Sequence, residues 1–194
     1  MGLIILLLSL ASPAQGAQIS VLTGIENGTI GVGHNKDIKN YAIGGLPLSI
    51  GVINDLESLP ISVRYAGAIL FDFPNTQLSR LGLEMEGRYF FMGGAWKRST
   101  ESGPVTVTNV NPHAMALSLK ASYGSYNATS ANNEDVAITG SVLEVRGGLV
   151  YSYQWSDTLC LDLGIESTAL SFHSSLDRIT PHMVAIQFGS RFFY

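Results

Sequence analysis

The chain has one cysteine, few charged residues and, after residue 16, no long uninterrupted apolar run. Cys160 has no second cysteine to pair with, so no internal disulfide framework supports the fold. Without about 18 consecutive apolar residues, no later segment can cross a membrane as a helix. Only 13% of the residues are charged, against 46% hydrophobic, and the net charge of -4 comes with no basic stripe. A helical membrane protein and a nucleic-acid partner are both excluded.

The common catalytic motifs are also missing. The sequence contains no Gly-x-Ser-x-Gly, no phosphate-binding loop, no dinucleotide fingerprint and no cysteine or histidine cluster at zinc spacing. We therefore expect no enzyme activity, no cofactor and no metal site. Two weaker groupings, Glu134 with Asp135 and His173 with Asp177 and His182, could hold a cation but are interpreted as polar loop residues.

The amino-terminal segment has the pattern of an export signal. An unbroken apolar run covers residues 3–10, and small residues follow at Ala14 and Gly16. The run is too short to span a bilayer, which takes roughly 20 apolar residues. We expect residues 1–16 to be a signal peptide cleaved after Gly16, or alternatively after Ala14, and residues 17–194 to form one domain. No Lys or Arg precedes the apolar run, so the true start could differ from Met1.

Strict alternation of apolar and polar residues takes the place of long apolar runs. Between Leu143 and Trp155 the odd-numbered residues are apolar, aromatic or glycine, whereas Glu144 and Arg146 occupy the even positions. A period of two indicates strands with one apolar face. Eight such segments are predicted, with approximate limits 18–26 (or to 33), 42–53, 60–71, 79–92, 113–124, 139–155, 159–169 and 183–194.

The predicted connections alternate between tight turns and longer polar loops. Residues 54–59 and 156–158 are tight, and residues 35–41, 72–77, 125–138 and 171–182 are longer. The exception is 93–112, which should be a short turn but is long enough to hold an extra hairpin around 105–110. The strand count is therefore eight or ten. Asn27-Gly28 is either a turn or a bulge within a long first strand.

The polar face distinguishes a membrane barrel from a secreted soluble one. It is rich in small residues and carries few charges, which suits a narrow interior better than a surface in water. An Arg or Lys facing lipid at the midplane costs about 2 to 4 kcal/mol. We expect an all-β, up-and-down antiparallel transmembrane barrel of about eight strands, with an internal ion-pair network. Its predicted members are Arg64, Glu84, Glu86, Arg88, Lys120, Glu144, Arg146, Asp162, Glu166 and Arg191.

The last strand ends on aromatic residues. Phe188, Phe192 and Tyr194 share one face, and other Tyr, Trp and Phe residues lie near the predicted strand ends. With the export signal and the alternation, this pattern resembles the small bacterial outer-membrane barrels, the group that contains the transmembrane domain of outer membrane protein A. The resemblance implies a location in the bacterial outer membrane. It also implies that the barrel-assembly machinery recognises Phe188, Phe192 and Tyr194.

The resemblance does not imply one activity, because the fold serves several. We expect a monomeric, non-enzymatic barrel with a charge-plugged lumen, whose loops contact lipopolysaccharide or an external partner. A narrow pore is one alternative. The other is a lipid A ester hydrolase, because His173 and Ser175 resemble the catalytic pair of outer-membrane lipid A deacylases if both face lipid. Leu176 replaces that family's Asn, and no acid on the last strand could orient the histidine.

Overall fold

We describe the protein from a computed structural model of the whole chain. The structure describes residues 18–34, 37–56, 59–72, 78–93, 100–102, 105–107, 112–128, 138–156, 158–173 and 178–193. The predicted signal peptide, residues 1–16, lies outside these ranges, as do Glu134, Asp135, Ser175, Asp177 and Tyr194.

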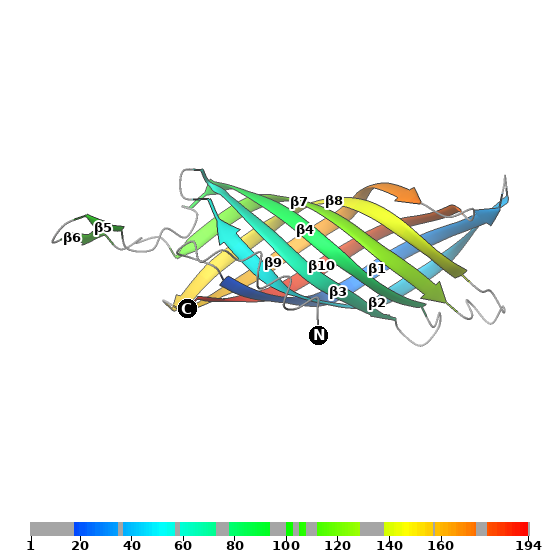
Figure 1. Cartoon of the computed structure of the whole chain (residues 1–194), viewed down its shortest axis with the longest axis horizontal. Coiled ribbons are helices and arrows are strands. Elements are labelled where there is room, and N and C mark those ends of the chain that lie inside the picture. The colour runs from blue at the N-terminus through cyan, green and yellow to red at the C-terminus, as the bar shows by residue number, and fades with distance from the viewer. Residues whose placement is uncertain are drawn as a thin grey trace.

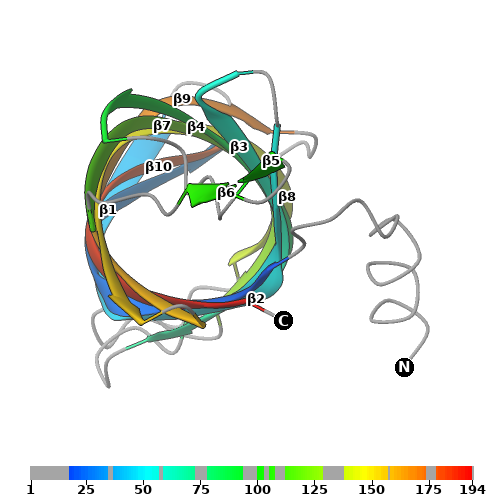
Figure 2. The same ribbon diagram turned by 90° about the vertical axis from the view of Figure 1, so that its left-hand side faces the viewer.

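Eight long strands close into one antiparallel barrel (Figures 1 and 2). Each strand pairs with the next in the order β1-β10-β9-β8-β7-β4-β3-β2, and β2 pairs with β1 to complete the circle. The prediction of an up-and-down barrel is confirmed, and the count is eight. The barrel strands are β1 (Gln18–His34), β2 (Asp37–Asp55), β3 (Ile61–Asp72), β4 (Leu78–Met92), β7 (His113–Ala128), β8 (Ile138–Ser156), β9 (Leu159–His173) and β10 (Arg178–Phe193).

The two remaining strands form a small hairpin outside the barrel. β5 (Thr100–Ser102) pairs with β6 (Val105–Val107) between β4 and β7, slightly earlier in the chain than the predicted hairpin at 105–110. Figure 1 shows it beyond the end of the barrel where the chain terminates, which we call the terminal end; the opposite end is the loop end. Gly93 leads out of β4 with φ 75°, where a Cβ would overlap the His113 carbonyl oxygen. The long predicted connection thus holds a hairpin rather than two further wall strands.

Several strands extend further toward the loop end than their alternation suggested. β1 runs through Asn27-Gly28 without a turn, since Asn27 pairs with Gly44 and Gly28 with Met183. The predicted polar loop at 35–41 was wrong, because β2 already begins at Asp37, opposite His34. Polar residues near the end of a strand are readily predicted as a loop from the sequence. The strands of a membrane barrel can, however, continue beyond the lipid into water.

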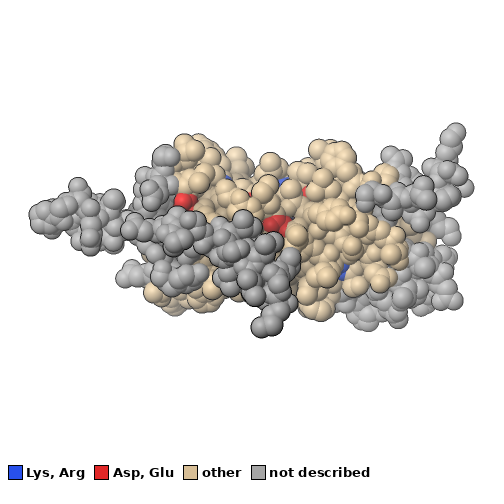
Figure 3. Space-filling view, in the orientation of Figure 1, with Lys and Arg blue, Asp and Glu red and all other residues tan. Residues whose placement is uncertain are grey.

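The outward face is apolar. Among barrel residues whose side chains the structure describes, no Asp, Glu, Lys or Arg occupies an outward position, and Leu81 and Leu119 are more than 60% exposed. On the face seen in Figure 3, the described atoms that are not covered by grey ones are almost all uncharged. Trp155, Tyr89 and Phe91 are exposed near the terminal end, where aromatic side chains suit a lipid-water interface. No helix among the described residues is long and apolar enough to cross a membrane.

Candidate functional site

The lumen contains the residues that could carry a function. Alternation turns every second side chain inward, and twelve charged side chains on the inward face are buried; Asp55, near the terminal end, is half-buried and accepts a hydrogen bond from Gln18. Of the twelve buried ones, six are basic and six are acidic, so the buried charges balance. They are Arg64, Arg80, Arg88, Lys120, Arg146 and Arg191, with Glu26, Glu84, Glu86, Glu144, Asp162 and Glu166.

Ten of these twelve are the predicted network residues, and the structure brings all ten into ion pairs or hydrogen bonds within the lumen. Sequence reasoning missed Glu26 and Arg80. Glu26 stood at the predicted end of the first strand, beside an apparent turn, and Arg80 stood at the edge of the fourth. Both keep the polar phase of their strands, which was the signal that could have included them.

The cluster nearer the loop end is built around two carboxylates. Glu144 accepts hydrogen bonds from Arg80 Nη1 at 3.1 Å, Arg146 Nη2 at 3.0 Å and the Tyr126 hydroxyl at 2.8 Å. Glu26 lies 2.8 Å from Arg146 Nη2 and 3.4 Å from Arg80 Nη1. The two arginines are therefore shared by the same two acids, and removal of either acid leaves each arginine at least one carboxylate.

This cluster continues along the lumen through Arg146. Its Nη1 lies 3.2 Å from Glu166, whose carboxylate also receives Lys120 Nζ at 2.6 Å. A second cluster lies nearer the terminal end, where Arg88 and Arg191 share Asp162 at 2.6 Å and 3.0 Å. Ser152 donates a further hydrogen bond to that carboxylate at 2.7 Å.

Arg64 and Arg88 extend the second cluster toward the middle of the lumen. Arg88 Nε lies 2.8 Å from Glu86, and Arg64 Nη1 lies 3.4 Å from Glu84 and 3.9 Å from Glu86. Hydroxyls complete the site, because Arg64 donates to Ser20 and Ser49 at 2.6 Å each. Buried charges are tolerated when pairing and hydrogen bonds replace the lost water, and these contacts do so.

A small cavity lies between the two clusters. The cavity there has a volume of about 10 Å³ and is lined by Glu84, Lys120 and Arg146, among others. That volume suits about one water molecule. Arg146 Nε has no protein partner among the described residues, so a water in this cavity is the natural acceptor for it.

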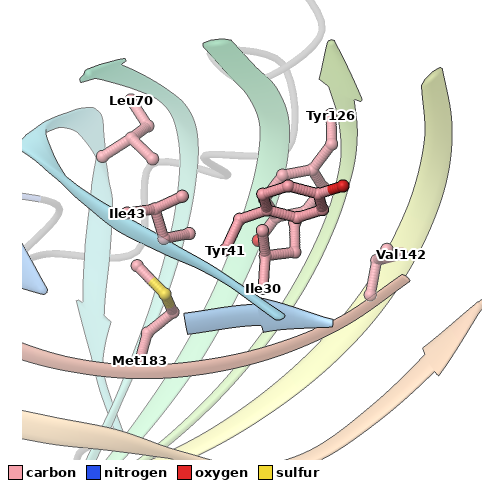
Figure 4. Close-up of a cluster of buried hydrophobic side chains, with 7 residues drawn as sticks. All are labelled: Ile30, Tyr41, Ile43, Leu70, Tyr126, Val142 and Met183. Atoms are coloured by element: carbon pink, nitrogen blue, oxygen red, sulfur yellow. The ribbon is translucent and has the colours of Figure 1, made fainter. Parts of the chain in front are cut away.

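Two clusters of buried apolar side chains lie in the lumen toward its two ends. Toward the loop end lies a cluster (Figure 4) formed by Ile30, Tyr41, Ile43, Leu70, Tyr126, Val142 and Met183, which we call the apolar cluster. Toward the terminal end, Phe90 packs with Ala114, Ala116 and Cys160. Cys160 is fully buried, and its sulfur lies 3.1 Å from Arg191 Nη2. The lumen is thus apolar on the loop-end side of the charged layer, whereas at the terminal end apolar Phe90 and Cys160 lie among Arg191, Gln18 and Asp55.

The structure contradicts the geometry that a hydrolase site at His173 requires. A bulge at Ala169 shifts the pairing of β9, so that Thr168 lies opposite Arg146 but Leu170 lies opposite Val145. Beyond it the phase is reversed: Phe172 pairs with outward Leu143, and His173 pairs with inward Val142. His173 therefore does not face lipid as the hydrolase alternative requires, because one inserted residue exchanges the faces of the strand. Ser175 lies outside the described residues.

The other predicted positions fall as follows. Phe188 and Phe192 point outward and are about half exposed. The structure brings no group of three or more potential metal ligands together among the residues that it describes. His182 lies on the outward face of β10, away from the ion pairs of the lumen.

Comparison with known proteins establishes similarity of fold. No protein-family model and no curated protein sequence matches the chain. The N-terminal β-barrel domain of Pseudomonas aeruginosa OprF is similar in structure, with a TM-score of 0.50 and 10% identity over 93% of this chain and 100% of that chain. The outer membrane protease OmpT from Escherichia coli has a TM-score of 0.50 and 10% identity over 94% of this chain and 98% of that one.

The chain has the fold of the bacterial outer-membrane barrels. Neisserial surface protein A covers a similar share, 93% of this chain and 100% of that chain, with 16% identity and a TM-score of 0.49. The predicted location in a bacterial outer membrane agrees with this fold and with the apolar exterior of the barrel. Because one of these barrels is a protease, the shared fold does not by itself separate enzymes from non-enzymes.

Proposed function

We propose that this protein is a closed, non-enzymatic outer-membrane barrel of the structural or adhesion type. The observation that supports closure best is the interior layer of six basic and six acidic side chains with a gap of about one water molecule. An ion crossing the lumen would have to separate buried ion pairs and displace apolar side chains on both sides of them. The barrel then serves as a rigid anchor that presents its loops outside the cell.

The test is conductance across planar lipid bilayers. Purified, refolded protein should give no steady current above that of protein-free bilayers, while a porin reconstituted in parallel conducts. A double variant, Arg80→Ala with Glu144→Ala, removes one of the shared pairs and should admit brief current steps if the charged layer contributes to the seal. A steady, ohmic current from the unaltered protein would replace the anchor with the narrow pore.

The same proposal assigns the contacts outside the barrel. Loops at the loop end meet lipopolysaccharide or an external partner, the apolar belt meets outer-membrane lipid, and the chain acts as a monomer. Phe188 and Phe192, exposed on the last strand, are the groups that the assembly machinery would recognise. Replacement of Phe192 by Ala should slow insertion in cells but leave spontaneous refolding into vesicles almost unchanged. Equal slowing of insertion in cells and of refolding into vesicles would mean that the Phe192 ring only stabilises the barrel.

The lack of enzyme activity is tested on lipid A. Mass spectrometry of lipid A from cells that express the protein, or its Ser175→Ala variant, should show the same acyl chains in both cases. Loss of an acyl chain with the unaltered protein and its return with Ser175→Ala would establish a hydrolase.

A further inference from the structure

The backbone pairing of the barrel wall is interrupted between β9 and β10 at the loop end. The pairing of these strands runs from Phe192 opposite Leu159 to Val184 opposite Ser167. Beyond that point, residues 168–173 pair only with β8 and residues 178–183 only with β1. Both strands continue, so this is a division of the wall and not its end. We call the unpaired interval the β9–β10 slot.

Local chemistry explains why pairing stops there. The bulge at Ala169 bends β9 and reverses its phase, and Pro181 has no N–H to donate across the gap. At the base of the slot the Thr168 hydroxyl accepts the Met183 N–H at 3.1 Å and donates to Glu144 at 3.2 Å. The slot therefore ends at the charged layer, and the rest of the slot lies between that layer and the loop end of the barrel.

The interior behind the slot is apolar. Met183 projects inward from β10 and belongs to the apolar cluster, together with Val142 on β8 and Ile30 on β1. Ile30 pairs with Pro181, so it lies level with the slot. Outside the slot, Leu170 and Phe172 are more than half exposed and continue the lipid-facing belt up to its edge. Met183, Val142 and Ile30 are at most 2% exposed, so side chains close the slot, and only their displacement would join the lipid-facing surface to the apolar cluster.

We propose that one acyl chain of an outer-leaflet lipid enters the lumen sideways through the β9–β10 slot and packs on the apolar cluster. The slot is continuous with the lipid-facing surface, and the groups behind it offer hydrocarbon contacts. An eight-stranded barrel can hold one small ligand of this width. Met183, an unbranched and adaptable side chain, is the group that gives way. The exposed His182 beside the slot lies where the lipid's polar part would remain.

This binding leaves the closed lumen intact. The acyl chain would enter on the loop-end side of Thr168, at the base of the slot. The ion pairs and the cluster of Phe90, Ala114, Ala116 and Cys160 lie on the other side, toward the terminal end. A lipid-binding barrel and a conducting barrel are therefore distinguishable. A barrel that is not labelled by lipid could still be closed to ions, and a barrel that conducts ions could still be labelled by lipid. The two experiments therefore test the two proposals separately.

The experiment uses vesicles that contain a phospholipid with a photoreactive diazirine in the middle of one acyl chain. After illumination, peptide mass spectrometry should find label on inward Ile30, Val142 or Met183 as well as on outward residues such as Leu149. Ala116, inward but below the charged layer, should stay unlabelled. Label restricted to outward residues would overturn the proposal, and so would a polypeptide strand co-purified in the slot.

Two variants separate entry from chance contact. Met183→Trp should occupy the position that the acyl chain would take behind the slot and abolish the inward label, whereas Val184→Trp on the outward face should leave it unchanged. Val142→Phe narrows the same space from the β8 side if Met183→Trp does not fold, as judged by heat-dependent gel mobility. Inward label that persists at full level in both folded blocking variants would refute lateral entry.

Discussion

Replacement of Glu144 by Gln is the most direct test of the charged layer. The amide keeps the size of the carboxylate but leaves five acidic groups against six basic ones. At about 3 Å and an effective dielectric constant of 20, each lost ion contact is worth roughly 5 kcal/mol before desolvation. Arg80 and Arg146 still contact Glu26 at 3.4 Å and 2.8 Å, so both arginines retain much of their electrostatic stabilisation. We expect a net loss of about 3 kcal/mol, at the low end for a broken buried ion pair.

The assay is reversible urea unfolding from phospholipid vesicles, followed by tryptophan fluorescence. Thr168→Val, which removes a neutral donor to Glu144 and the acceptor of the Met183 N–H, should cost about 1 to 2 kcal/mol and sets the scale. The double variant Glu144→Gln with Arg146→Gln restores the charge balance, so its cost should fall below the sum of the singles by about 1 to 2 kcal/mol. Additive costs, or a single loss no larger than that of Thr168→Val, would refute the shared ion-pair cluster.

Three further outcomes are expected. Leu149→Arg on the outward face should destabilise the barrel by about 2 to 4 kcal/mol, whereas Thr139→Arg near the loop end should cost about 0 to 1 kcal/mol; equal costs in the same urea assay would contradict the assignment of faces. Gly148→Ala should lower the unfolding free energy because a Cβ there overlaps the Ile165 carbonyl oxygen, and Gly147→Ala should not because that position is open; the reverse order would show that the pairing is misassigned. Cys160 should resist a maleimide reagent until the barrel unfolds, as measured by the mass of the intact protein, and rapid labelling of the folded form would show that the terminal end of the lumen is open.

Alternation was enough to predict the barrel and the side on which each charge lies. Leu143 to Trp155 kept the predicted phase, and Glu144 and Arg146 are both buried inside. The strand limits could not be predicted as well, because residues such as Asn27-Gly28 form turns in short hairpins and are equally compatible with a strand paired on both sides. The bulge at Ala169 left no mark on the alternation, and so the face of His173 was predicted wrongly.

Which charges meet could not be predicted from phase alone. Arg146 contacts Glu26, which is 120 residues away in the chain, because the stagger of the strands around the barrel brings them to one level. That stagger depends on every pairing in the circle, whereas alternation reports each strand by itself. The apolar cluster was missed for a related reason. Ile30 and Ile43 are apolar residues on inward faces, and the prediction had reserved those faces for polar residues.

The layered interior suggests what the ion pairs contribute. A narrow barrel must fill its lumen, and leucines would fill it at least as well as buried ion pairs, which often add little net stability. Leucines inside as well as outside would, however, remove the difference between the two faces, and a strand shifted by one residue would lose little. With Arg64, Arg88 and Arg146 inside, such a shift sends charged side chains into lipid at about 2 to 4 kcal/mol each. The charged layer thus fixes the register, and the register in turn places the bulge and Pro181 where the wall divides.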